Sequence, residues 1–132
     1  MSATRGLLLF AHGARDPQWA DPFDDIARRV RLQRPGVPVA LAFLELMAPD
    51  IVSAGATLAA AGCTAVTVVP LFLGAGGHVR RDIPAMLDGL RATHPGVTWT
   101  LTPAIGELAP VVAAMAATAV DLLDAPAGSA VP

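Results

Sequence analysis

Four apolar runs divide the chain at fairly regular intervals, at residues 6–11, 37–44, 65–71 and 97–102. The runs at 6–11 and 65–71 are nearly continuous and rich in leucine or valine, which is typical of strands buried on both faces of a parallel sheet. Pro70 cannot donate to a strand ladder, so regular pairing is expected to end near it. The pattern therefore predicts four short strands.

Apolar residues at helical spacing fill the stretches between these runs. Asp16 is placed to cap a first helix with Pro17 at its first position, and Asp50 is placed to cap a second. Gly62 is expected to end the second helix. The start of the third stays open, because Pro84 disfavours helical geometry at the residue before it. The predicted helices cover 16–33, 50–61, a segment that ends near 93, and 107–123.

Strands and helices thus alternate along the whole chain, and the predicted loops are short. This alternation predicts a three-layer α/β/α fold with a four-stranded parallel sheet and helices on both faces. The flavodoxin-like strand order 2-1-3-4 would place the first and third strands side by side. We expect one domain at 1–124, followed by a frayed tail at 125–132 that is rich in small residues, proline and glycine.

Two histidines come directly after the first and third predicted strands, and each has glycine beside it. His12 follows the run at 6–11, and His78 follows the run at 65–71 and the glycines at 74, 76 and 77. Either histidine alone would more often be structural or merely exposed. Because carboxyl ends of parallel strands share one edge of a sheet, the pair is a candidate metal site for Co, Ni, Fe or Zn.

Charged residues accompany both histidines. Glu45 ends the second predicted strand, inside an apolar run, which is an unusual place for a carboxylate. It is either a third metal ligand, a proton acceptor near the metal, or simply a solvated acid in a loop. Arg15, Arg80 and Arg81 flank the histidines, either to bind carboxylates or phosphates or as solvated residues at helix starts. The glycines are expected to allow positive φ and a close approach of a ligand to the backbone. They do not match the dinucleotide fingerprint, which needs a third glycine in register.

Composition excludes several functions. The 132 residues are 54% hydrophobic with a net charge of −2, and all nine basic residues are arginine, so no basic footprint for nucleic acid exists. No apolar run approaches a membrane span and no secretory signal is visible, so a cytoplasmic protein is expected. The lone Cys63 excludes an internal disulfide and a cysteine zinc site. Trp19 and Trp99 are expected in the core, and His94 is expected to have no catalytic role.

The motifs at 12–16, 43–49 and 69–84, together with 103–106, resemble the short-form sirohydrochlorin chelatases. These are class II chelatases, related to the cobalt chelatase of anaerobic cobalamin synthesis and the iron chelatase of siroheme synthesis. The resemblance covers roughly residues 6–123. It implies insertion of a divalent metal, Co²⁺ before Fe²⁺ or Ni²⁺, into the carboxylate-rich tetrapyrrole sirohydrochlorin, without ATP or an organic cofactor.

The resemblance also implies roles for individual residues. His12 and His78 would hold the metal, and His12 would accept a pyrrole proton. Glu45 would contact metal or macrocycle. The macrocycle would be lined by Leu73, Gly74, Ala75, Gly76, Gly77 and His78, and Arg15, Arg80 and Arg81 would meet its carboxylates.

Two other functions stay open at this point. The same two histidines would serve a non-catalytic carrier of metal or tetrapyrrole, or the chain would be a structural domain without a bound ion. The last helix, at 111–123, has almost no polar face, and a helix that is apolar all round must be covered on more than one side. A sheet of this size covers one side only, so we expect a homodimer, with no membrane or nucleic-acid partner.

Overall fold

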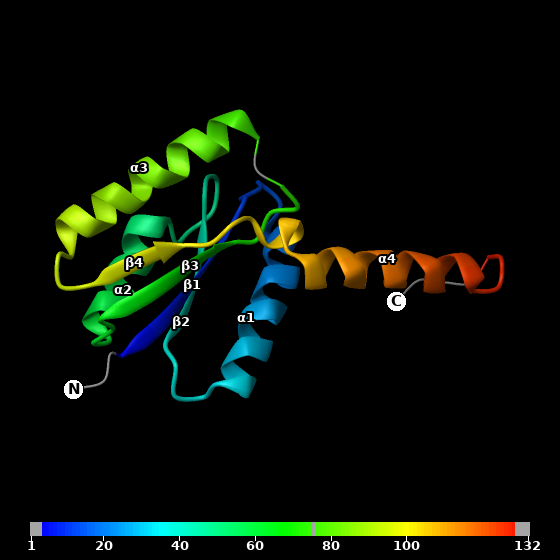
Figure 1. The fold of residues 1–132 in the computed structure, drawn as a ribbon, viewed down its shortest axis with the longest axis horizontal. Helices are drawn as coiled ribbons and strands as arrows, with labels where there is room; N and C mark the ends of the chain where they lie inside the picture. The colour runs from blue at the N-terminus through cyan, green and yellow to red at the C-terminus, as the bar shows by residue number, and fades with distance from the viewer. Residues whose placement is uncertain (1–3, 75, 129–132) are drawn as a thin grey trace.

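The computed structural model describes residues 4–74 and 76–128, apart from the side chain of His78 (Figure 1). The predicted ligand-lining Ala75 and the end of the predicted tail, 129–132, therefore lie outside the described residues. The strands are β1 (Arg5–Ala11), β2 (Val39–Phe43), β3 (Ala65–Pro70) and β4 (Thr98–Leu101). The α-helices are α1 (Asp21–Gln33), α2 (Ile51–Ala60), α3 (Gly77–Thr93) and α4 (Ala109–Asp124), with short 3₁₀ helices η1 (Pro17–Ala20) and η2 (Ile105–Glu107).

The four strands form one parallel sheet in the order β2-β1-β3-β4, which confirms the predicted fold class and strand order. Ala11 at the end of β1 pairs with Phe43 at the end of β2, and Phe10 pairs with Pro70 at the end of β3. These three strands therefore end level with one another. The loops that follow them leave from one edge of the sheet, where ligands bind in folds of this kind.

Helices lie on both faces of the sheet, but they cover the faces unequally (Figure 1). On one face α2 and α3 pack over a core in which Leu8, Phe10 and Val68 are fully buried. On the other face α1 packs chiefly against β2, and Leu9 of β1, whose side chain points to this face, is buried. Side chains alternate between the faces along each strand, so these neighbouring leucines belong to different layers.

The predicted helix caps are present. The Asp16 carboxylate accepts a hydrogen bond from the Gln18 N–H at 3.0 Å, and Asp50 accepts from the Ser53 N–H at 2.8 Å. Gly62, at φ 90°, ends α2 as expected. The predicted first helix is divided into η1 and α1, each with a proline in its first turn. Pro84 lies inside α3, which nevertheless begins at Gly77.

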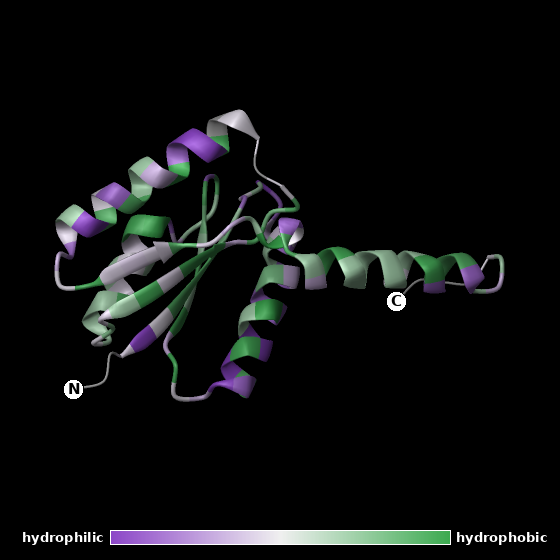
Figure 2. Cartoon of the chain, viewed as in Figure 1, coloured by the Kyte–Doolittle hydropathy of each residue, from purple (hydrophilic) through white to green (hydrophobic). Residues whose placement is uncertain are grey.

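The last helix departs most from expectation. We predicted that the sheet would cover one side of it, but α4 projects away from the sheet and packs mainly against η2 (Figure 1). None of its residues is buried, and most of them are coloured toward the hydrophobic end of the scale in Figure 2. Its large side chains are between 41% and 81% exposed at Val112, Met115, Val120, Leu122 and Leu123. Within the described part of the chain, no helix is both long and apolar enough to span a membrane.

Candidate functional site

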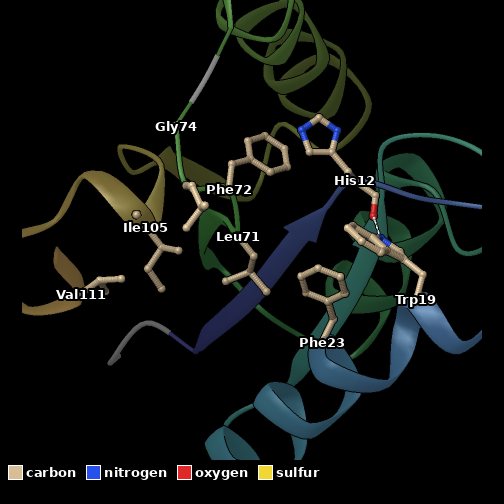
Figure 3. Close-up of a pocket in the computed structure, with 10 residues that line it drawn as sticks. His12, Trp19, Phe23, Leu71, Phe72, Gly74, Ile105 and Val111 are labelled. Carbon is tan, nitrogen blue, oxygen red and sulfur yellow. Dashed lines mark hydrogen bonds between the residues drawn. The ribbon is translucent and has the colours of Figure 1, made fainter. Parts of the chain in front are cut away.

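His12 lies at the carboxyl end of β1, one residue past the strand, and is partly buried. Its imidazole stacks on the ring of Phe72, with centroids 4.2 Å apart and planes inclined by 29° (Figure 3). Phe72 follows β3 and is only 4% exposed, so the core holds it in place. The pair joins the first and third strands at the sheet edge, and Phe72 limits the orientations open to the imidazole.

Trp19 in η1 holds the same loop from the other side. Its indole N–H donates a 2.6 Å hydrogen bond to the backbone carbonyl of His12 (Figure 3). Trp19 is 44% exposed, so its predicted place in the core was wrong. Trp99 is 3% exposed and occupies the core as predicted. The difference arises because Trp19 precedes α1 and lies beyond the sheet edge, whereas Trp99 lies within β4.

Glu45 lies two residues past β2, in the loop next to that of His12. Leu44 donates its N–H to the carbonyl of Ala11 at 2.8 Å, which carries the β1–β2 pairing past the strand ends. A Cβ on Gly13 would lie 1.5 Å from the backbone oxygen of Glu45, so the two backbones touch where Gly13 has no side chain. The sheet edge therefore brings the exposed Glu45 beside the loop of His12, as the sequence predicts.

A cavity of about 410 Å³ opens next to His12 (Figure 3). Its other lining residues are mostly apolar or aromatic, and they come from η1, α1, the loop after β3, and the η2–α4 segment. They are Trp19, Phe23, Leu71, Phe72, Leu73, Gly74, Ile105, Gly106 and Val111. An apolar cavity with one imidazole at its wall suits a largely apolar ligand that meets a metal or a proton acceptor at one point.

The glycine loop after β3 is open, but it is not conformationally unusual at its described positions. Gly74, Gly76 and Gly77 do not take the positive φ that we expected. A Cβ on Gly76 would meet nothing within 4 Å, and Cβ atoms on Gly74 and Gly77 would meet only side-chain ends near 4 Å. These glycines leave the backbone accessible to a flat ligand, which agrees with the close approach of a ligand that their sequence predicts.

His78 is the second residue of α3, so its backbone lies in the first turn of that helix. Gly76, the N-cap, has no side chain to satisfy the first amide groups, which leaves positive partial charge at this helix end. Among the residues with described side chains, no three His, Cys, Asp or Glu gather closely enough to hold an ion. A metal shared by His12 and His78 thus stays a prediction.

The three arginines at the predicted site are solvent-exposed. Arg80 reaches the Glu107 carboxylate in η2 at 3.4 Å, and Arg81 donates to the carbonyl of Gly77 at 3.3 Å. An exposed pair of this length contributes little stability, so the Arg80 guanidinium can exchange Glu107 for a ligand carboxylate at small cost.

The η2 turn fixes the outer wall of the site. Gly106 donates its N–H to the carbonyl of Phe72 at 2.9 Å, and a Cβ on Gly106 would lie 2.4 Å from the backbone of Leu73. This close approach holds Leu73 outward, where it is 76% exposed. Sequence reasoning overlooked Phe72, Ile105 and Glu107 as site residues, although each lies near a predicted carboxyl end of a strand.

The chain is thus an α/β protein with a parallel sheet, and His12 lines an apolar cavity at the carboxyl edge of that sheet, where open α/β folds bind their ligands. The family model described as CbiX matches residues 6–122. The chain belongs to the CbiX family.

Several known proteins are similar to the chain. The sirohydrochlorin cobaltochelatase of Methanococcoides burtonii is 32% identical over 96 residues, which cover 73% of each chain. The sirohydrochlorin cobaltochelatase of Methanothermobacter thermautotrophicus is 39% identical over 82 residues, 62% of this chain and 57% of the relative.

Solved structures share the fold. The CbiX protein from Marinobacter aquaeolei VT8 superposes with a TM-score of 0.80 at 33% identity, over 91% of this chain and 98% of that one. SirB from Bacillus subtilis, solved with Fe³⁺, gives a TM-score of 0.78 at 24% identity. The match covers 93% of this chain but 48% of SirB, so this chain spans about half of the SirB length.

Proposed function

We propose that this protein is an ATP-independent, cytoplasmic chelatase that inserts a divalent metal into sirohydrochlorin, with Co²⁺ as the preferred ion and Fe²⁺ or Ni²⁺ as alternatives. The observation that carries the proposal is the imidazole of His12, which is partly buried, stacked on Phe72 and placed at the wall of an open apolar cavity. Membership of the CbiX family and the names of the cobaltochelatase relatives support the substrate. No organic cofactor takes part.

The reaction exchanges two protons of the macrocycle for one metal ion, so the site must hold the ion weakly and accept protons. In the proposed mechanism His12 and His78 bind the incoming ion through imidazole nitrogens, which suit Co²⁺, Ni²⁺ and Fe²⁺. Pyrrole nitrogens replace these ligands one after another. His12, once released from the ion, accepts a pyrrole proton on the ring nitrogen that the ion has left. The second proton passes to solvent or to Glu45.

The remaining site residues would hold the macrocycle. Residues 73–78 offer an open backbone against which a flat ring can lie. Arg80 and Arg81 are within the first two turns of α3, beside the uncapped helix end, so both guanidinium and amide N–H groups favour carboxylates there. Arg15 would meet a carboxylate on the His12 side. In this arrangement the charged rim of the ring faces arginine, and its nitrogens face His12.

A non-catalytic carrier with the same ligands is distinguished by turnover. Metal-free sirohydrochlorin in tenfold excess over protein is mixed with Co²⁺, Fe²⁺ or Ni²⁺ under anaerobic conditions, and metallation is followed by absorbance. The proposal predicts many product molecules per chain, with Co²⁺ fastest. A burst that stops at one ring per site, with no acceleration beyond it, would identify a carrier instead.

We further propose that the protein works as a homodimer in which α4 is covered by the second copy. The helix carries no basic residue and presents large apolar side chains to solvent, and burying them contributes about 25 cal/mol per Å². The surface that would cover α4 is the part of the sheet face beside α1 that α1 does not reach, where Thr67 of β3 and Thr100 of β4 are paired in register and exposed.

In the proposed dimer, α4 of each copy would lie on the part of the other copy's sheet that α1 leaves uncovered. The same two surfaces would then meet twice, as a two-fold dimer requires. Light scattering at micromolar concentration should give twice the chain mass of 13.5 kDa. Met115→Glu should give monomers with an unchanged circular-dichroism spectrum, because α4 contributes no buried residue to the core. Ala92→Glu, on the exposed surface of α3, is the matched control and should remain dimeric. A wild-type mass of one chain would defeat the dimer.

A further inference from the structure

Trp19 has a hydrogen-bonded indole nitrogen and is nevertheless largely exposed, and the fold does not require this exposure. Its indole nitrogen, the single polar atom of the side chain, is already hydrogen-bonded to the His12 carbonyl. The residue is nevertheless 44% exposed to solvent. Such exposure of a residue with a large aromatic ring forgoes hydrophobic stabilisation, since a large ring contributes most when it is buried.

The ring is also held in position. Trp19 packs on Phe23 with centroids 5.6 Å apart and planes inclined by 55°, and Phe23 in turn meets Phe43 at the end of β2 edge-on at 6.4 Å. This row of three aromatic rings, together with the hydrogen bond to His12, fixes Trp19 relative to the sheet edge. A fixed and exposed aromatic ring is a prepared binding surface, because little side-chain entropy is lost when a ligand covers it.

The indole ring of Trp19 lies close to the proposed catalytic imidazole of His12. Trp19 and His12 both line the 410 Å³ cavity, and the hydrogen bond ties the backbone that carries the imidazole directly to the indole (Figure 3). The cavity wall opposite is formed by Leu71, Ile105 and Val111, which offer apolar surface without charge. A ligand that covers Trp19 is therefore brought beside His12 by apolar contact, while charged groups on its rim remain outside.

We propose that Trp19 is a substrate-binding residue whose exposed ring stacks on the face of a flat, conjugated macrocycle and sets its distance from His12. The inference rests on the proposed function for the identity of the macrocycle. Offset stacking of two π systems and burial of the remaining indole surface supply affinity without reading the substituents of the ring. Trp19 thus acts in binding and placement, and the arginines act in recognising carboxylates.

A purely structural role makes a different prediction. If Trp19 only anchors the His12 carbonyl, then Trp19→Phe and Trp19→Leu, which both lack the N–H donor, should lower kcat equally and leave KM unchanged. If the ring stacks on substrate, Trp19→Phe should stay within about threefold of the wild-type KM. Trp19→Leu and Trp19→Ala should raise KM about tenfold or more, with kcat much less affected. Equal KM values in all four proteins would overturn the proposal.

Fluorescence provides a readout that is independent of turnover. The chain has two tryptophans, so Trp99→Phe leaves Trp19 as the single emitter and Trp19→Phe leaves the buried Trp99 as the control. Metal-free sirohydrochlorin is titrated into each variant at equal absorbance, with free N-acetyltryptophanamide to correct for light absorbed by the ligand. We expect strong, saturable quenching of Trp19 and loss of its access to acrylamide, and weaker effects on Trp99. Unchanged access of Trp19 to acrylamide at saturating ligand would overturn the stacking.

These measurements separate the inference from the proposed function. If the wild type binds the macrocycle and quenches at Trp19 but makes no metallated product, chelatase activity is wrong and stacking stands. If metallated product forms in many turnovers while Trp19→Ala keeps the wild-type KM, chelatase activity stands and the role of Trp19 is wrong.

Discussion

Replacement of Gly13 by alanine tests how the first two loops of the sheet edge are joined. An ideal Cβ on Gly13 would lie 1.5 Å from the backbone oxygen of Glu45 and 2.7 Å from its carbonyl carbon. Non-bonded heavy atoms rest about 3.5 Å apart, so the two backbones would have to separate by roughly 2 Å. Neither obstacle is a flexible side-chain end, and the displacement must therefore be taken up by the loops themselves.

The cost can be bounded from these distances. Overpacking that requires backbone shifts costs about 1–3 kcal/mol, and this site belongs at the upper end because backbone meets backbone. At about 4 °C per kcal/mol, we expect Gly13→Ala to melt about 8–12 °C below the wild type. A displacement of this size beside His12 should also lower turnover about 100-fold, because misplacement by an ångström commonly has such an effect.

Thermal unfolding by circular dichroism and initial rates at 20 °C measure the two effects separately. Gly89→Ala is the matched control, since Gly89 lies inside α3 and a Cβ there would meet nothing within 4 Å. Alanine is favoured over glycine in helices by up to about 1 kcal/mol, so this variant should melt at or above the wild-type temperature. A Gly13→Ala protein that melts and reacts like the wild type would refute the contact between the loops.

Three further outcomes are expected. Arg80→Ala/Arg81→Ala should raise KM for the macrocycle more than it changes metal affinity, and the difference from wild type should shrink as salt screens the charges; an unchanged KM at low salt would show that both arginines are only solvated. The Ser53 N–H lowers the pKa of Asp50, so its stabilisation of α2 is complete at neutral pH and is lost as pH falls below about 4. Asp50→Asn keeps a good cap but cannot titrate, so melts between pH 7 and 3 should show a smaller loss for the variant, and parallel losses would contradict this. Glu45→Gln should cut turnover strongly with little change in melting temperature, and turnover equal to wild type would make Glu45 a bystander.

The sheet was predictable because its determinants are local and periodic. Apolar runs with short loops leave few arrangements for a parallel sheet, and Asp16, Asp50 and Gly62 mark helix ends through interactions within a few residues. The neighbouring positions of His12 and the glycine loop followed from strand order alone. Pro84 shows the limit of such rules, since tertiary packing of Ile83 and Leu87 in the core outweighs the local preference against helix.

The aromatic part of the site was not predictable in the same way. Trp19 fits a helical apolar period, and nothing in that period reveals that η1 extends past the sheet edge. The stacking of Phe72 on His12 and the contact of Gly106 with Leu73 join residues that are distant in sequence. The exposure of α4 depends on the direction in which the chain leaves η2. The apolar sequence of α4 does not determine this direction, because it is equally compatible with burial on its own sheet or on another copy.

The role of His12 in metal insertion is tested by one comparison of initial rates. Wild type, His12→Ala and His94→Ala are assayed with saturating Co²⁺ and sirohydrochlorin, with intact folds verified by thermal melts. His94 follows α3 and precedes β4, away from the carboxyl edge of the sheet, and serves as the histidine control. We expect His94→Ala to match the wild type and His12→Ala to fall to the rate without protein. A His12→Ala rate equal to that of the wild type would contradict this role of His12.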